Sequence, residues 1–436
     1  MQKCKFICNI LLILFILPIL FGCKEENHDN KIDLDSEIIP VDDYSNINLS
    51  EDILFVIDTL ENTHPVFYLD EVPDDYYKQK KYINENMDKL INDDMTFEYE
   101  LQKLIATLND NHTRLTKHST NYIVMNLKYN NDNLITSYNQ TDYLLKNING
   151  VTIDRLMKII DECYPAENDS AKYLNYEFEI ANTLILEKAG IDTDNIQIEM
   201  ENSITGISES VNPDALFINY PSEQKSLTSE IVDDIIYIDM NFCQMDKDFY
   251  IAIDDIKEKI DQGYSDVIID LRGNTGGNST SCDWLLKTLE MTPPTHGAYT
   301  PNSEMARKVL GNNNPPPNNE DHFIISQDLK SASTNDDINL IVLTDKKTLS
   351  AANMLGTWVQ DGELGIIIGE TSAQSPTFFG DTTTVELPNK NFSLQIALRK
   401  IYRPDSDANQ VELVPDIILS GDMDALASAI DYFDDM

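Results

Sequence analysis

The chain has 436 residues, and its 75 acidic and 32 basic side chains give it a formal net charge of −43. A surface this negative repels nucleic acid and anionic lipid, so both are excluded as electrostatic partners. The length exceeds what one simple core requires, and it predicts two or three domains.

Residues 1–23 are typical of an export signal. Lys3 and Lys5 precede a short apolar run, and the small residue Gly22 stands before Cys23. The apolar run is shorter than the ~20 residues that cross a bilayer. The stretch LFGC resembles a bacterial lipobox, which implies a lipidated Cys23; the alternative is an uncleaved apolar anchor. We therefore expect an exported protein, held by the lipid at the outer face of the cell membrane.

Residues 24–48 contain many acids and amides and few large apolar groups, so they predict a disordered tether. Three of the six cysteines belong to the export segment. The other three are far apart in sequence and odd in number, which favours neither a disulfide framework nor a zinc site. We expect each to be a small buried apolar side chain, and we expect no metal and no cofactor. These three are Cys163, Cys243 and Cys282.

Residues 49–120 predict a helical N-terminal domain. Apolar residues recur at helical spacing in SEDILFVIDTLENTHP, PDDYYKQKKYINENMDKLI and TFEYELQKLIATLND. The first helix should begin at the Ser50 cap and end before Pro65. The domain ends in NDNHTRL.

Residues 121–222 predict a compact α+β module of short strands and one or two helices. In DYLLKNINGVTIDRLMKIIDECYP, a strand leads into a turn at Asn149-Gly150, a second short strand follows, and a helix begins near Asp154.

Residues 223–436 predict an α/β core. The strands DIIYIDM, DVIIDL, INLIVLT and LGIIIGE alternate with the helices DFYIAIDDIKEKIDQGY, STSCDWLLKTLE and SAANMLGTWVQD. This order favours a mostly parallel sheet with helices on its faces. A Pro- and Asn-rich excursion over 291–321 predicts a lid or loop insertion. The strands TTTVELP and FSLQIALRKIYRP should complete the domain.

Ser350 is a candidate nucleophile. It follows the strand INLIVLT and begins a helix, so it lies beyond the carboxyl end of a strand, where α/β sheets bind ligands. The free N–H groups and positive dipole end of a helix N-terminus can stabilise an anionic intermediate. The alternative is that Ser350 is only a helix N-cap.

Two other segments could take part in chemistry. The glycines of DLRGNTGG let the backbone approach a ligand closely; without GxGxxG or GxxxxGK, a tight strand-to-helix connection is the alternative to a phosphate cradle. His112 lies at a helix end outside any apolar stripe. Its imidazole is suited to deprotonate a serine, and the alternative is a solvated loop histidine. The surroundings of the remaining histidines suggest no site; these are His64, His118, His296 and His322.

From Leu49 to the C-terminus, the chain resembles the C-terminal processing (tail-specific) peptidases and tricorn-core serine peptidases, particularly their exported bacterial members. The resemblance rests on LNDNHTRL, LLKNINGVTIDRL, IIYIDMNFC, DVIIDLRGNTGGN, LIVLTDKKTLSAANMLGTWVQD, IIIGET and VELVPDI. It implies an α+β multidomain fold with a PDZ-like middle module and a crotonase/ClpP-like α/β core. A PDZ-like module implies capture of an extended peptide by strand addition.

The resemblance also implies roles for individual residues. Ser350 would be the acylating nucleophile and His112 the general base. The N–H of Ala351, with that of Gly276 or Gly277, would form the oxyanion hole.

The processing branch activates its serine with a lysine some two dozen residues later and an acid one helical turn after the serine. Here SAQSPTFFG contains no lysine, and Asn353 stands one turn on, so we expect His112 rather than a Ser–Lys dyad. The tricorn branch has a serine beside its histidine, where this chain has Asn111. Glu412 and Asp405 are candidate orienting acids.

We therefore expect an exported serine peptidase that hydrolyses peptides or unfolded proteins through an acyl-enzyme on Ser350. The absent lysine motivates an alternative, a catalytically inactive peptide- or ligand-binding surface lipoprotein of the same fold. A crotonase-like or nucleotide-binding α/β enzyme shares the strand-turn-helix pattern, but the absent phosphate loop and the export signal disfavour it.

Overall fold

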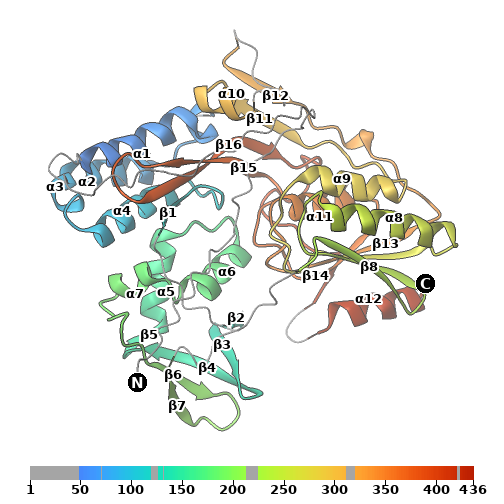
Figure 1. Ribbon diagram of the computed structural model, residues 1–436, viewed down its shortest axis with the longest axis horizontal. Coiled ribbons are helices and arrows are strands. Elements are labelled where there is room, and N and C mark those ends of the chain that lie inside the picture. Colours follow the sequence, from blue (N-terminus) through green and yellow to red (C-terminus); the bar gives the residue numbers. More distant parts are fainter. Residues whose placement is uncertain are drawn as a thin grey trace, which may run out of the picture.

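The computed structural model describes residues 49–69, 71–118, 126–130, 132–212, 224–310, 320–419 and 423–436. The expected export signal, Cys23 and the tether lie outside these residues. None of the helices in the described part of the chain is long and apolar enough to cross a membrane. The described residues form a mixed α+β fold with three sheets, which confirms the predicted fold class (Figure 1).

The first sheet has six strands in the order β17-β14-β13-β10-β9-β8. The pairs from β17 to β9 are parallel, and only the β8–β9 pair is antiparallel, which confirms the predicted mostly parallel sheet. The strands are β8 (Leu227–Val232), β9 (Ile235–Met240), β10 (Asp266–Asp270), β13 (Asn339–Thr344), β14 (Ile366–Gly369) and β17 (Ile417–Ile418).

Helices cover both faces of this sheet (Figure 1). On one face, α8 (Lys247–Asp261), α9 (Ser279–Thr288) and α11 (Ala351–Asp361) pack on alternate strand residues such as Val267 and Val342. On the other face, α12 (Ala425–Asp434) packs on the intervening residues, which include Ile268 and Ile341. Because both faces are buried there, the central strands β10 and β13 are apolar over most of their length rather than alternating.

The second sheet is antiparallel and has the order β1-β16-β11-β12, with β15 beside β16. The last two predicted strands form a hairpin in this sheet. The excursion, expected as a lid or loop insertion, contains the regular elements β11 and α10. The elements are β1 (Arg114–Lys117), β11 (Gly297–Pro301), α10 (Glu304–Leu310), β12 (His322–Ile325), a 3-10 turn (Leu329–Ser331), β15 (Phe378–Glu386) and β16 (Phe392–Tyr402).

The predicted N-terminal helices pack on this second sheet, and Phe392, Leu394 and Ile396 of β16 belong to their core. Gln395 of β16 also donates to the carbonyl oxygen of His112 at 2.9 Å, which fixes the segment between the last of these helices and β1. The helices are α1 (Leu49–Thr63), a 3-10 helix (Pro65–Tyr68), α2 (Asp74–Glu85), α3 (Met87–Leu90) and α4 (Asp94–Ala106).

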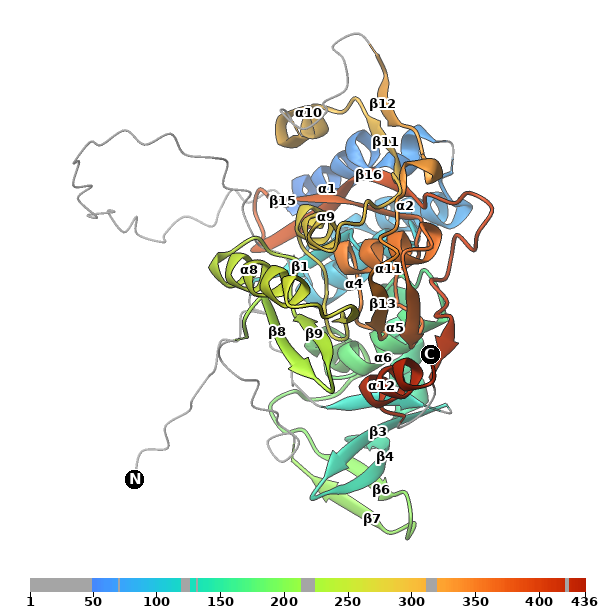
Figure 2. The ribbon, with the colours of Figure 1, turned by 90° about the vertical axis from the view of Figure 1, so that its right-hand side faces the viewer.

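The third sheet is antiparallel, in the order β2-β3-β4-β6-β7, with β5 on β4. Figure 2 shows it at the end of the molecule away from α1 and α10. Asn149 and Gly150 have φ values of 48° and 80°, as the predicted tight turn requires. The elements are β2 (Leu127–Asn130), β3 (Asn133–Tyr138), β4 (Thr141–Ile148), β5 (Val151–Thr152), α5 (Ile153–Cys163), α6 (Asp169–Glu179), α7 (Thr183–Lys188), β6 (Ile198–Asn202) and β7 (Ser208–Val211).

Candidate functional site

Ser350 lies between β13 and α11, beyond the carboxyl end of its strand as predicted. Its backbone has φ 51° and ψ −122°, a conformation that costs a residue with a side chain on the order of 1–3 kcal/mol. Ser350 occupies the N-cap position of α11, but within the described chain its side chain makes no capping hydrogen bond. A serine held on a strained strand-to-helix turn has its hydroxyl free for another purpose.

The glycine turn after β10 lies directly against Ser350. A Cβ on Gly276 would stand 2.5 Å from the Cβ of Ser350, and a Cβ on Gly277 would stand 2.4 Å from the carbonyl oxygen of Cys243. The φ values of the two glycines are 101° and 135°, which side chains rarely allow. Both positions therefore require glycine, which allows the backbone of the turn to lie close to Ser350.

The two glycines differ in what their N–H groups bind. The N–H of Gly276 donates to Oδ1 of the buried Asn274 at 2.8 Å. In the part of the chain that is described, the N–H groups of Gly277 and of Ala351, the first residue of α11, have no acceptor. Of the two glycines considered from the sequence, Gly277 is the one with an available donor.

A pair of thiols lies beneath this turn. The Sγ atoms of Cys243 and Cys282 are 3.4 Å apart, and Sγ of Cys282 lies 3.4 Å from the carbonyl oxygen of Ala351. Both side chains are buried, as expected from the sequence, but their contact was not foreseen. Burial raises the pKa of the Cys243 thiol, so this residue acts as packing under the glycine turn rather than as a nucleophile.

His112 lies in the segment between α4 and β1 and is only 8% exposed, so the solvated-loop interpretation is wrong. Its ring stacks on Phe378, with 5.6 Å between the centroids. Burial lowers the pKa of His112, the charge of Arg114 adds to this, and the charge of Asp110 opposes it. A neutral imidazole at pH 7 can accept a proton.

Asp110 is fully buried and organises the turn of His112. It accepts the His112 N–H at 2.8 Å and the Thr113 hydroxyl at 2.5 Å, and its Oδ1 lies 3.9 Å from Nδ1 of His112. His64 Nε2 lies 3.0 Å from Asp110 Oδ2. Since Val66 N–H donates to Nδ1 of His64, the proton of His64 is on Nε2. Burial alone would raise the pKa of Asp110, but the His64 hydrogen bond and the neighbouring histidines lower it overall.

A second buried acid, Glu167, reaches the site from the loop between α5 and α6. It accepts the N–H of Asn111 at 3.2 Å and the N–H of Ser375 at 2.9 Å. One ligand atom each of Glu167, Asp110 and His112 lie within 4.8 Å of one another. Two carboxylates and an imidazole suit a divalent metal ion, but here the carboxylate oxygens are already bound to N–H and O–H donors.

The loop 372–375 joins the two sides of the site. Gln374 Oε1 accepts the N–H of Ser350 at 2.5 Å, while the carbonyl oxygen of Ala373 accepts the side-chain amide of Asn111 at 3.3 Å. Asn353, one turn into α11, donates to the carbonyl oxygen of Ser375 at 3.2 Å. The same short loop thus contacts the serine and the residue before His112.

The lysines near Ser350 in sequence turn away from it. Lys346 pairs with Glu177, and Lys347 lies over the ring of Phe178 at 5.1 Å. The position 24 residues after Ser350, near where the resembled branch has its lysine, is Gln374.

The charges of Asp110 and Asp381 raise the pKa of His112 and the charge of Arg114 lowers it, while the predicted orienting acids, Asp405 and Glu412, are hydrogen-bonded to other residues. Oδ1 of Asp405 accepts the N–H of Asp407, and the Glu412 N–H donates to Asn409. From the sequence, His64 was set aside and neither Asp110 nor Glu167 was assigned a role. The Asp-x-His spacing was a local signal for Asp110, whereas His64 and Glu167 come from distant segments of the chain.

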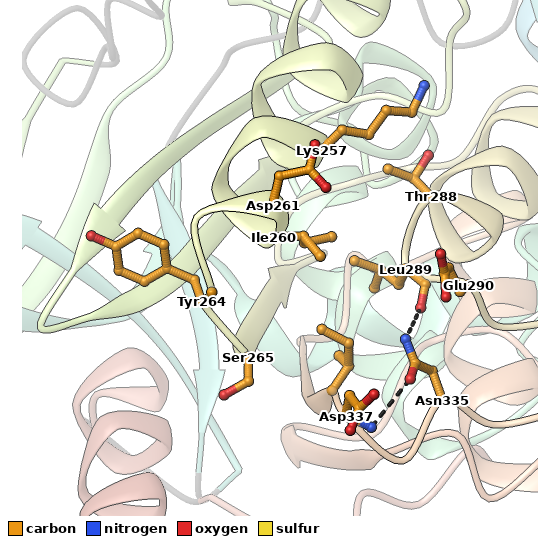
Figure 3. Close-up of a pocket in the computed structure, with 12 residues that line it drawn as sticks. Lys257, Ile260, Asp261, Tyr264, Ser265, Thr288, Leu289, Glu290, Asn335 and Asp337 are labelled. Carbon is orange, nitrogen blue, oxygen red and sulfur yellow. Dashed lines mark hydrogen bonds between the residues drawn. The ribbon is translucent and has the colours of Figure 1, made fainter.

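A pocket of about 350 Å³ lies at the opposite end of the parallel sheet (Figure 3). Ser265 and Ile338, which line it, directly precede the amino ends of β10 and β13, whereas Ser350 and the glycine turn follow the carboxyl ends. Since α/β sheets bind ligands beyond the carboxyl ends of their strands, this pocket is separate from the candidate site.

Residues 234–419 match the model of Peptidase family S41. The chain is similar to the structure of mature CPAF complexed with lactacystin, at 12% identity over 89% of this chain and 97% of that one, with a TM-score of 0.53. It is similar to mature CPAF, at 12% identity over 85% and 92%, with a TM-score of 0.52. It also matches a photosystem II D1 C-terminal processing protease at 13% identity over 86% and 94%, with a TM-score of 0.46. No curated protein matches the chain.

Proposed function

We propose that this chain, whose residues 234–419 match Peptidase family S41, is a serine-type peptidase in which Ser350 is the nucleophile and His112 the general base. The observation that carries the proposal is the strained backbone of Ser350, packed on Gly276 and tied to the turn of His112 through loop 372–375. A strained serine at a strand-to-helix turn beside free N–H groups fits acyl transfer.

In the proposed reaction, Oγ of Ser350 attacks the carbonyl carbon of a peptide bond while His112 accepts the hydroxyl proton. The N–H groups of Gly277 and Ala351 stabilise the oxyanion of the tetrahedral intermediate. His112 then gives the proton to the leaving amine, and water hydrolyses the acyl-enzyme. The neutral state of His112, which its lowered pKa favours, is the state that this cycle requires.

The substrate in this proposal is a peptide or an unfolded protein. Strands β2 and β7 are the edges of the third sheet, and an edge offers unpaired backbone groups to an extended peptide. The predicted export signal and lipidated Cys23 would place the reaction at the outer face of the cell membrane.

One observation favours a second function, peptide binding without catalysis. A buried glutamine, Gln374, stands near where the resembled branch has its activating lysine, and the nearest lysines in sequence pair with the middle module. If His112 cannot act as the base, the fold retains a binding role only.

A fluorophosphonate probe separates the two functions, because it reacts only with an activated serine. We expect covalent labelling of the wild type, none of Ser350→Ala, and strongly reduced labelling of His112→Ala. His118→Ala, which removes a half-exposed histidine paired with Glu386, is the matched control and should label as the wild type does. An unlabelled wild type across mildly acidic to alkaline pH would rule out the peptidase.

A further inference from the structure

We propose that Glu167 is a positioning residue of this site, whose carboxyl group ties the turn of His112 to the loop that binds the N–H of Ser350 and places its charge beside the imidazole. The inference rests on the proposed function and deepens it. It assigns the orienting acid to the middle segment of the chain, away from Glu412 and Asp405.

The contacts of Glu167 join three separate segments. One carboxyl oxygen accepts the N–H of Asn111, the residue before His112, and the other accepts the N–H of Ser375, the residue after Gln374. Glu167 itself precedes α6. This buried side chain, together with the Asn111–Ala373 hydrogen bond, therefore ties the turn of His112 to the loop that contacts Ser350.

The next residue, Asn168, holds Glu167 in place. Its side chain caps α6 by accepting the N–H of Ala171 at 2.8 Å. Its Nδ2 donates to the carbonyl oxygens of Ser372 and Val411, both at 3.1 Å. Because Ser372 belongs to the same loop as Ser375, residues 167–168 are hydrogen-bonded to this loop at two positions.

Asp110 performs a different task. Its oxygens bind His64, Thr113 and the N–H of His112, so it shapes the turn of His112 from within. Within the described part of the chain, these hydrogen bonds and its ion pairs with the two histidines do not include a residue of loop 372–375. The connection from the His112 turn across to Ser375 runs through Glu167.

Charge gives Glu167 a second effect. Burial raises its pKa to about 8, the charge of Asp110 adds to this, and the N–H groups of Ser375 and Asn111 oppose it. Among the described residues, Asp110 and His112 have ligand atoms within 4.8 Å of its carboxyl group, and His64 is hydrogen-bonded to Asp110. The charges of Arg114 and Asp381 also act on His112, and loop 372–375 contains no titratable side chain. Ionisation of Glu167 adds negative charge beside His112, which favours the imidazolium and makes His112 a stronger base.

The pH profile of fluorophosphonate labelling tests this role. We expect the wild-type labelling rate to rise as the pH passes about 8, where Glu167 ionises. Glu167→Gln should label roughly tenfold or more slowly at neutral pH, because one amide oxygen cannot accept both N–H groups. The labelling rate of Glu167→Gln should also not increase as the pH passes about 8, whereas the rate of Glu167→Asp should still increase.

Glu98→Gln is the matched control, since Glu98 is a buried acid in α4 whose pKa burial raises to about 7. Glu98→Gln should keep the wild-type labelling rate at neutral pH and the increase of that rate near pH 8. The inference is overturned if Glu167→Gln is labelled at the wild-type rate. It is also overturned if Glu167→Gln is labelled slowly but its labelling rate still increases near pH 8.

Two further outcomes are informative. If neither Glu167 variant folds, the pH profiles of the wild type and Glu98→Gln test the role of Glu167. A labelling rate that increases near pH 8 in both proteins supports this role, and a labelling rate that does not change with pH overturns it. A wild type that never labels overturns the proposed function, and this inference with it, whereas normal wild-type labelling with an unaffected Glu167→Gln overturns the inference alone.

Discussion

The backbone N–H of Ser350 donates a hydrogen bond to Oε1 of Gln374 at 2.5 Å, across 24 residues of sequence. Gln374 is 1% exposed. Because a backbone N–H can only donate, the oxygen of this amide must face Ser350, and Nε2 faces elsewhere with no partner among the described residues. Gln374 therefore holds the strained serine and leaves a buried donor beside it.

Removing this acceptor should slow the reaction of the serine. Gln374→Ala leaves the N–H of Ser350 unsatisfied, a loss of about 1–3 kcal/mol, so we expect labelling to fall roughly tenfold or more. Gln224→Ala, in an exposed position, is the control. Equal labelling rates for the two variants would show that Gln374 does not hold the serine.

The glycine turn provides a steric test. Gly276→Ala places a Cβ 2.5 Å from that of Ser350 and should nearly abolish labelling, since displacing the oxyanion donors costs about 3 kcal/mol. Gly273→Ala is matched in backbone strain, with φ 80°, but its Cβ meets no described atom within 4 Å. It should cost only about 1 kcal/mol of folding free energy. Labelling of Gly276→Ala at the rate of Gly273→Ala would contradict this geometry.

His64 should matter for stability through Asp110. His64→Phe keeps a ring against Phe379, whose centroid is 4.6 Å away, but removes the donor to the buried carboxylate. We expect a loss of about 1.5–3 kcal/mol in unfolding free energy, measured by chemical denaturation. His64→Gln can still donate and should lose less. Equal losses would mean that the hydrogen bond contributes nothing.

His296 should make the fold sensitive to acid. Burial lowers its pKa to about 3, and neither ring nitrogen has a partner in the described chain. Below the unfolded value of about 6.5, the unfolded chain binds a proton that the folded protein refuses, so stability falls as the pH drops from about 6.5 towards 3. At about pH 5 the loss is roughly 2 kcal/mol.

His296→Phe retains an aromatic ring against Trp358, whose ring lies 5.6 Å away, and cannot be protonated. Its unfolding temperature should therefore fall less than that of the wild type between about pH 7 and pH 5. A wild type and variant that lose stability in parallel would contradict the assignment.

Local patterns were enough to predict the parallel sheet, because strands buried on both faces alternate with amphipathic helices there. They also predicted that Ser350 follows a strand, whereas the nearness of the glycine turn to Ser350 was implied by the family resemblance. They could not show that β16 pairs with β1, since pairing across hundreds of residues leaves no local period. Glu167 was missed for the same reason: it is 208 residues from Ser375 in sequence.

The central claim is tested most directly by identifying the residue that a fluorophosphonate modifies in the wild-type protein, by mass spectrometry of its proteolytic fragments. We predict a single adduct on Ser350 that is strongly reduced in His112→Ala and kept in His118→Ala. An adduct on another serine, or an unmodified Ser350 in a folded wild type, would contradict it.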